Sequence, residues 1–131
     1  MVLNHIGFGV TDVKGTVHLF ETYFGLMRAP QTPFNDKMAF VIDDAGSLIT
    51  LFKADDAVYP QIFHMGFMQQ TFERVQAIRA QLVAGGFEPG EIREEHGRMT
   101  FYFKAPGNFV VEVNSLSPEQ KTELKQKVNE N

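Results

Sequence analysis

The sequence contains no cysteine, no tryptophan and no apolar run long enough to cross a bilayer. Without cysteine the chain cannot form a disulfide, a thiolate metal site or a cysteine nucleophile, so histidine, aspartate and glutamate are its only strong metal ligands. A membrane span needs about 20 consecutive apolar residues, and the first residues lack the basic and apolar regions of a signal peptide. We therefore expect a cytoplasmic protein with no membrane partner.

Positive charge is also scarce and spread along the chain. Twelve lysines and arginines stand against 16 aspartates and glutamates, which gives a formal net charge of -4. Nucleic-acid binding normally needs a basic patch, so we expect no nucleic-acid partner and favour a small-molecule substrate. The 131 residues, of which 44% are hydrophobic and 21% charged, are typical of one folded domain.

What the chain does contain is an internal repeat, because His5-Ile6-Gly7-Phe8 recurs as His64-Met65-Gly66-Phe67. Each copy lies in a short strand-like run, Val2 to Val10 and Gln61 to Met68, and is followed by an amphipathic helical pattern. Threonine precedes each helical pattern as a candidate cap, and glycine ends it. The predicted caps are Thr11 and Thr71, and the predicted ends are Gly25 and Gly85-Gly86.

Three further strand candidates follow each predicted helix, separated by turns rich in proline, glycine, asparagine and aspartate. The second and sixth strands are placed near Leu26–Thr32 and Phe87–Glu94. Each half therefore reads βαβββ. We expect a single α+β domain with two tandem βαβββ modules, about residues 1–57 and 58–115, whose strands form a curved eight-stranded mixed sheet around a cleft.

A short helix should follow over about residues 117–128. Ser117-Pro118-Glu119-Gln120 is a capping-box pattern with proline at the first helical position. Leu124 and Val128 give this helix one narrow apolar edge, which we expect to lie against the domain or against a partner subunit; the alternative is a frayed terminus.

Alternation along the strands separates a helix-facing set of side chains from an opposite set. The helix-facing set is apolar, whereas the opposite set carries histidine, glutamate, arginine and tyrosine. Such a face is a poor core but a good lining for a concave site. The predicted helix-facing residues are Met38, Phe40, Ile42, Ile49, Leu51, Met99, Phe101, Phe103, Phe109, Val111 and Val113, and the opposite set includes His5, Thr50, His64, Arg98, Thr100, Tyr102, Lys104, Glu112 and Asn114.

The histidine at the start of each module and the ending Pro106-Gly107-Asn108-Phe109-Val110-Val111-Glu112-Val113 resemble the vicinal oxygen chelate superfamily. This superfamily includes glyoxalase I, extradiol dioxygenases, fosfomycin-resistance transferases and bleomycin-resistance proteins. The resemblance covers about Leu3 to Asn114. It implies that the first and last strands of each module supply the ligands of one divalent metal ion, here His5, His64 and Glu112, with Thr50 at the fourth position.

The resemblance therefore implies a divalent-metal-dependent enzyme whose small substrate chelates the metal through adjacent oxygens. Fe, Mn, Ni, Zn and Mg all remain candidates. Thr50 replaces the glutamate that glyoxalase I uses for proton transfer, so lyase or isomerase chemistry and dioxygenase chemistry both stay open. The candidate catalytic residues are Glu112 and Tyr102, and the candidate substrate-binding residues are Arg98, Thr100, Tyr102 and Thr50.

Alternative interpretations accompany these assignments. A metal-free protein of the bleomycin-resistance kind would use the same cleft to sequester a planar ligand. Glu112 could instead form an ion pair with Arg98 or Lys104, and His18 and His96 are expected to be surface residues. The resemblance also implies a homodimer, in which the two modules of a site come from one chain or are exchanged between two.

Overall fold

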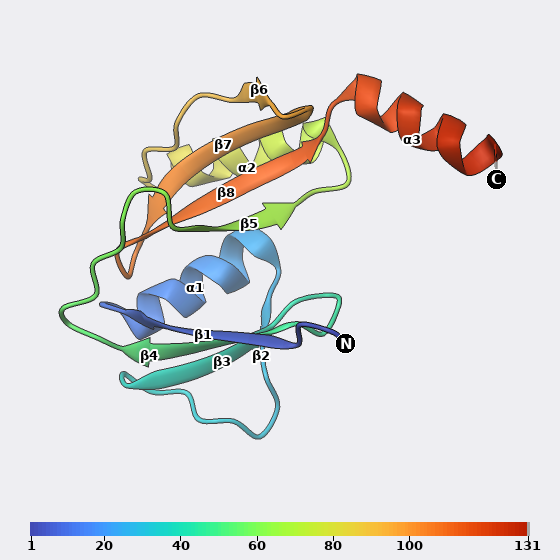
Figure 1. Ribbon diagram of the computed structural model, residues 1–131. Coiled ribbons are helices and arrows are strands. Elements are labelled where there is room, and N and C mark those ends of the chain that lie inside the picture. Colours follow the sequence, from blue (N-terminus) through green and yellow to red (C-terminus); the bar gives the residue numbers. More distant parts are fainter. Residues whose placement is uncertain (131) are drawn as a thin grey trace. The chain divides into compact units, whose positions relative to one another are not determined.

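The computed structural model describes residues 1–130 and confirms an α+β fold of two βαβββ modules followed by a helix (Figure 1). The elements are β1 (His5–Val10), α1 (Val13–Phe24), β2 (Met27–Arg28), β3 (Met38–Ile42), β4 (Leu48–Lys53), β5 (His64–Met68), α2 (Phe72–Ala84), β6 (Arg93–Glu95), β7 (Arg98–Ala105), β8 (Phe109–Leu116) and α3 (Pro118–Glu130).

The strands pair into two four-stranded sheets that repeat one topology. Their orders are β1-β4-β3-β2 and β5-β8-β7-β6, so each module places its strands in the same sequence. The first strand of each module runs parallel to the last, as β1 does to β4 and β5 to β8. The repeat in the sequence is therefore a repeat of strand pairing.

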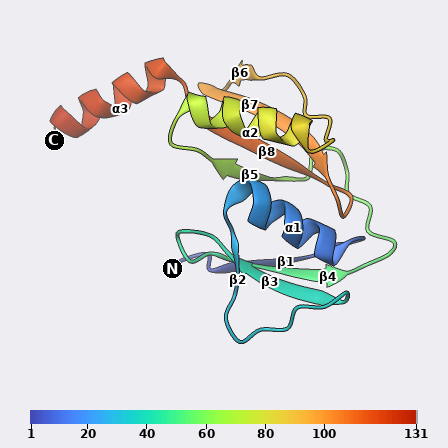
Figure 2. The ribbon, with the colours of Figure 1, turned by 180° about the vertical axis from the view of Figure 1, so that it is seen from behind.

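Two compact units contain these sheets. The first comprises residues 1–63 together with 105–109, and the second comprises residues 64–104 together with the chain from 110 onward. In the first unit α1 covers one face of its sheet, and in the second α2 does the same (Figure 2). The fully buried side chains include Val10, Val17, Phe20, Val41 and Leu51 in the first unit and Val75, Ile78, Leu82, Phe101 and Val111 in the second.

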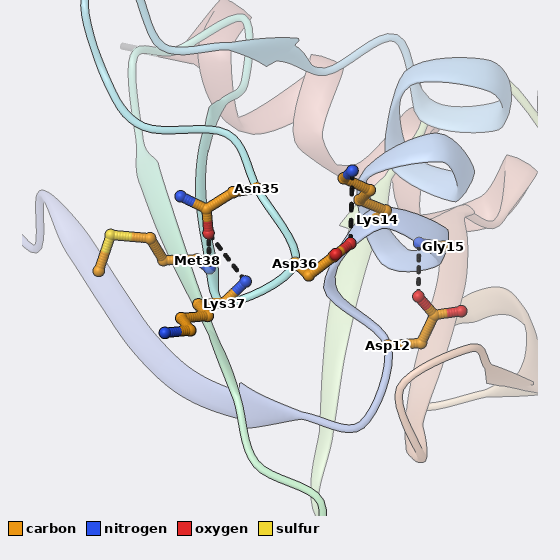
Figure 3. Close-up of polar contacts among 7 residues, drawn as sticks. All are labelled: Asp12, Lys14, Gly15, Asn35, Asp36, Lys37 and Met38. Carbon is orange, nitrogen blue, oxygen red and sulfur yellow. Dashed lines mark hydrogen bonds and ion pairs between the residues drawn. The ribbon is translucent and has the colours of Figure 1, made fainter.

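Asp12, not the predicted Thr11, caps α1. The Asp12 carboxylate accepts a hydrogen bond from the backbone N–H of Gly15 at 2.9 Å (Figure 3). The backbone N–H of Thr11 instead donates to the carbonyl of Gly107, so the helix begins one residue later. The predicted end at Gly25 is confirmed, with φ at 69° in the left-handed region that favours glycine. Thr71 caps α2 as predicted, because its hydroxyl accepts from the N–H of Arg74.

The predicted facing of β3 is wrong. Ala39 and Val41 are fully buried on the helix side, where they pair with Leu51 and Ile49, whereas Met38, Phe40 and Ile42 lie on the opposite face. Every residue of this strand is apolar, so alternation gave no direction. Asn35 sets the start of the strand, because its side-chain oxygen accepts from the N–H groups of Lys37 and Met38 (Figure 3).

The other boundary corrections concern short strands. β1 and β5 begin at their histidines rather than at Val2 and Gln61, and β2 has two residues and β6 three. Pro30 follows β2 and Pro89 precedes β6, so both lie in the predicted ranges but outside the observed strands. Before β6, a hydrogen bond from the backbone N–H of Gly90 to the carbonyl of Tyr102 connects the chain to β7. These edges shorten the sheets without changing their order.

The hairpin turn between β7 and β8 belongs to the first unit. Phe109 is buried, but its ring lies edge-on to Phe8 and Phe20, with centroid distances of 5.1 and 6.2 Å. The carbonyl of Pro106 accepts from the Thr16 hydroxyl, and the Asn108 side chain donates to the carbonyl of Ala57. The Pro106-Gly107-Asn108-Phe109 sequence therefore has a structural role.

α3 begins with the predicted cap, since the N–H of Gln120 donates to the Ser117 hydroxyl at 3.3 Å. Over its described residues α3 buries no side chain, and Leu124 and Val128 are exposed. The expected packing of that apolar edge against the domain is therefore not seen. Within residues 1–130, the helices are too short or too polar to span a bilayer.

Candidate functional site

His64 and Glu112 share one face of the second sheet. The parallel register pairs His64 with Val110 and Gly66 with Glu112, and paired residues in a sheet point their side chains to the same side. Val111 and Val113 point the other way and are fully buried. His64 is exposed and Glu112 is half-buried at this polar face.

Two neutral donors hold the Glu112 carboxylate. The Tyr102 hydroxyl donates to Oε1 at 2.8 Å, and the Asn114 amide donates to Oε2 at 2.9 Å. Within the described residues Glu112 forms no ion pair with Arg98 or Lys104, so the expected alternative is not observed. A half-buried carboxylate that keeps its charge needs such donors.

Tyr102 contacts Glu112, Glu95 and His64 on this face. Its hydroxyl lies 3.4 Å from Glu95 Oε2, and its ring meets the ring of His64 edge-on at 5.7 Å between centroids. The hydrogen bond to Glu112, then burial, then the negative charges of Glu112 and Glu95 raise the pKa of Tyr102 from 10.0 to about 12. The phenol therefore stays protonated and acts as a hydrogen-bond donor.

Arg98 lies at the start of β7 and contacts neutral groups. Its Nη1 donates to Asn114 Oδ1 at 3.3 Å and lies 3.5 Å from Met68 Sδ. Thr100 is buried in the middle of the same strand, and Lys104 is exposed at its far end. Arg98, Asn114, Glu112 and Tyr102 therefore form a continuous hydrogen-bonded row.

The first unit presents the repeat-equivalent positions. Gly7 pairs with Thr50 in the register in which Gly66 pairs with Glu112, which supports the alignment of the two modules. His5 is exposed, and its Nδ1 lies 2.7 Å from the side-chain oxygen of Asn4. In the tautomer with the proton on Nδ1 this contact is a hydrogen bond to that oxygen, and the Nε2 lone pair is then available as a ligand.

The surroundings of Thr50 are apolar. Thr50 is only 6% exposed, and it pairs across the sheet with Phe40. The β3 and β4 residues that share its face are Met38, Phe40, Ile42, Leu48 and Phe52, and β1 adds His5, which pairs with Leu48. Apart from His5, this face of the first unit is apolar and suits an apolar or aromatic group, whereas the corresponding face of the second unit is polar.

The chemistry of the donors suits a divalent metal, because two imidazoles and a carboxylate are common ligands of such ions. Within residues 1–130, neither unit by itself contains a group of three histidine, aspartate or glutamate side chains that could hold a metal. His18 and His96 are exposed, as expected.

Sequence reasoning gave no role to three residues of this face. Asn114 holds Glu112, Glu95 approaches Tyr102, and Gly66 leaves space beside the carboxylate. Asn114 has the same parity as Glu112, and Gly66 is part of the sequence repeat, so both carried a signal. Glu95 lies in a three-residue edge strand whose register the sequence did not indicate.

Solved structures share this fold over most of the chain. "Structure of a possible Glyoxalase from Bacillus cereus" is 34% identical and aligns with 86% of this chain and 97% of that chain at a TM-score of 0.79. A mutant of the fosfomycin resistance protein FosX from Listeria monocytogenes, complexed with Mn(II) and 1S,2S-dihydroxypropylphosphonic acid, is 23% identical, with 93% and 99% covered and a TM-score of 0.74. At that identity the likeness to FosX shows the fold alone.

A shorter similarity relates the chain to the crossover junction endodeoxyribonuclease RuvC of Neisseria meningitidis serogroup A, at 34% identity over 58 residues. The alignment covers 44% of this chain and 32% of that protein. The chain thus spans about a third of the length of the curated relatives it matches.

The family assignment rests on a longer match. The sequence model of the Glyoxalase/Bleomycin resistance protein/Dioxygenase superfamily matches residues 2–113, which include both modules and the positions of His5, Thr50, His64 and Glu112. Together with the repeated topology and the Bacillus cereus structure, this match shows that the chain belongs to the Glyoxalase/Bleomycin resistance protein/Dioxygenase superfamily.

Proposed function

We propose that this protein is a divalent-metal-dependent enzyme that acts on a small substrate carrying adjacent oxygen atoms. His5, His64 and Glu112 would bind one metal ion. This donor set is compatible with Fe, Mn, Ni, Zn and Mg. The bound ion would supply a Lewis acid that polarises the substrate oxygens. The reaction would be of the lyase or isomerase class or of the dioxygenase class.

The observation that carries this proposal is the matching register of the two modules. His5 pairs with Leu48 and Gly7 with Thr50, in the same register in which His64 pairs with Val110 and Gly66 with Glu112. A carboxylate beside valines on a strand is costly unless it has partners, and Glu112 has two donors that fix both of its oxygens. This prepared carboxylate supports a role as a ligand.

The remaining polar residues of the face would act on the substrate. Tyr102 holds its proton on Oη, since its pKa is raised to about 12, and donates it to Glu112. The free lone pair of Oη would accept a hydrogen bond from a substrate hydroxyl. Arg98 and Thr100 lie on the same strand and would orient the substrate. Thr50 has no carboxylate to move a proton, so this chain would not use a base at that position as glyoxalase I does.

Metal content tests the proposal. Protein purified without added metal should contain about one divalent ion per chain by elemental analysis, and Glu112→Ala should lose most of it, as expected when a first ligand is removed. Lys104→Met, a change at an exposed position of β7, should keep the metal. Near-zero metal in the wild type, even after reconstitution with Mn(II) or Zn(II), would contradict the proposal.

The second candidate function is metal-free sequestration of an aromatic or planar ligand. It is favoured by the apolar residues around Thr50, where Phe40 and Phe52 lie. Tight binding of planar ligands to a metal-free wild type that is unaffected by Glu112→Ala would support it.

We also propose that the protein is a homodimer with two equivalent sites. The family resemblance supports this assembly, and the longer edge strands β1 and β5 have outer backbone groups that a partner can cover. Small-molecule substrates remain the expected partners.

A further inference from the structure

The polar face of the second unit contains a row of three groups whose polarity is aligned. Arg98 Nη1 donates to Asn114 Oδ1, and Asn114 Nδ2 donates to Glu112 Oε2. The amide thus turns its oxygen toward a cation and its nitrogen toward an anion. In this arrangement each hydrogen bond polarises the next, which strengthens the bond to the carboxylate.

Asn114 is well placed to fix a neighbour. It is only 7% exposed, and its backbone carbonyl accepts from the N–H of Gln69 at 2.7 Å. Both ends of its side-chain amide are engaged. The amide therefore has one orientation in which its bonds are satisfied, and that orientation presents Nδ2 to Glu112.

Gly66 provides the space for this contact. A Cβ atom at position 66 would lie 2.9 Å from Glu112 Oε2 and 3.6 Å from Asn114 Nδ2. At the repeat-equivalent Gly7 the nearest atom to such a Cβ is Phe52 Cε2 at 3.4 Å, which is an ordinary contact. Glycine at position 66 therefore lets the carboxylate lie over the neighbouring strand.

We propose that Asn114, anchored by Arg98 and given space by Gly66, is a positioning residue that holds the Glu112 carboxylate in its metal-binding orientation. The inference rests on the proposed function, because Glu112 is its proposed ligand. Asn114 does not touch the metal in this account; it acts through Glu112. Partners of this kind typically change metal affinity by about 10- to 100-fold.

Mn(II) alone is the probe, measured by competition with a chelator on the full chain. Asn114→Leu should weaken Mn(II) binding by about 10- to 100-fold, and Arg98→Met should weaken it less. Lys104→Met is the matched control, since it removes a positive charge from the same face of the same strand without touching the row. A purely electrostatic role of Arg98 would give the opposite sign, because losing a cation favours cation binding.

The double variant Arg98→Met/Asn114→Leu should bind Mn(II) as Asn114→Leu does, because Arg98 acts only through the amide. Gly66→Ala should fold, since the displaced atom is the end of a flexible side chain, but should bind Mn(II) more weakly. Gly7→Ala, its repeat-equivalent control, should bind as the wild type does. Thermal unfolding without metal checks that each variant is folded.

A second measurement does not depend on metal. In the metal-free wild type the Asn114 side-chain NH₂ should exchange slowly with solvent by NMR, and Glu112→Ala should accelerate its exchange. Fast exchange in the wild type would overturn the inference, whether or not the wild type binds Mn(II). Absence of Mn(II) binding by itself would contradict only the proposed function. Wild-type Mn(II) affinity in folded Asn114→Leu would overturn the inference while leaving the proposed function intact.

Discussion

At the scale of single residues, Thr50 and Glu112 occupy equivalent positions in very different surroundings. Glu112 is half-buried among polar donors. Thr50 is 6% exposed and lies beside Phe40, on the face that also carries Phe52. Position 50 therefore has little room for solvent. The consequence is that a charged side chain at position 50 would be costly without a partner.

This difference makes Thr50→Glu an informative variant. A fourth ligand should tighten Mn(II) binding, whereas the buried carboxylate should lower the stability of the metal-free protein. The rise in melting temperature on adding Mn(II) should therefore be larger in Thr50→Glu than in the wild type. Thermal melts with and without Mn(II) measure both effects. An equal response in the two folded proteins would mean that position 50 does not reach the metal.

Tyr102 gives a prediction about pH. In the metal-free protein its phenol should titrate near pH 12 rather than 10, seen as the ultraviolet absorbance that Tyr102→Phe removes. Because the folded-state pKa is raised, the stability that Tyr102 contributes is fully present below pH 10 and is lost as pH rises through about 12. The pH dependence of unfolding should show this loss in the wild type.

The hydrogen bond to Glu112 is the largest cause of the raised pKa of Tyr102, and Glu95 contributes less. Glu112→Gln should therefore lower that pKa more than the matched change Glu95→Gln does. The reverse order would contradict the network described for this face.

The sequence predicted which residues of the second sheet face away from α2 but not how they contact one another. The alternation that places Val111 and Val113 in the core also places Glu112 and Tyr102 opposite. The roles of Asn114 and Gly66 depend on contacts of about 3 Å with the Glu112 carboxylate. The alternation of polar and apolar residues does not determine such contacts. Hydrogen-bond partners require the register of β5 against β8, which only the structure supplies.

At the scale of elements, β3 shows the limit of reading alternation. The strand Met38–Ile42 is apolar at every position, so both of its faces look like a core. Assigning the larger side chains to the helix side was wrong, because Ala39 and Val41 are the fully buried residues of the strand. Where polar and apolar residues do alternate, as in β7, the predicted facing agrees with the burial of Phe101 and Phe103.

The cap of α1 can be tested directly. Asp12→Ala should lower the free energy of unfolding by about 1 kcal/mol, since it removes an acceptor from the first turn. Thr11→Ala should have a smaller effect, because the Thr11 side chain does not form the cap. Chemical denaturation of the two variants measures the difference.

Asp36→Ala is the control for charge. Asp36 forms an exposed ion pair with Lys14 at 3.3 Å (Figure 3), and such pairs contribute about 0–1 kcal/mol. A larger loss of stability in Thr11→Ala than in Asp12→Ala would contradict the observed cap.

At the scale of the whole molecule, the duplication was visible in the sequence because each module repeats His-x-Gly-Phe. The division into units was less visible. Residues 105–109 connect two strands of the second module yet pack in the first unit through Phe109, Pro106 and Asn108. The alternation of residues could not predict this. It places Phe109 on the core side of its strand, but it does not tell which of the two units that core belongs to.

At this scale, the prediction concerns whether the two modules of a site come from one chain or from two. If the modules are exchanged in a homodimer, mixing His5→Ala chains with Glu112→Ala chains should restore part of the metal binding, since heterodimers would contain one intact site. Metal content after refolding the mixture measures this. Each variant refolded alone is the control. A monomer by light scattering at micromolar concentration would contradict exchange.

The central claim is that His5, His64 and Glu112 bind one divalent metal ion, and the four histidines of the chain allow a direct test. Substoichiometric Mn(II) added to protein with labelled histidine should broaden the imidazole NMR signals of His5 and His64 first. The exposed His18 and His96 serve as internal controls and should stay sharp at the same ratio. Broadening that spares His5 and His64, or that affects all four histidines equally, would contradict the account.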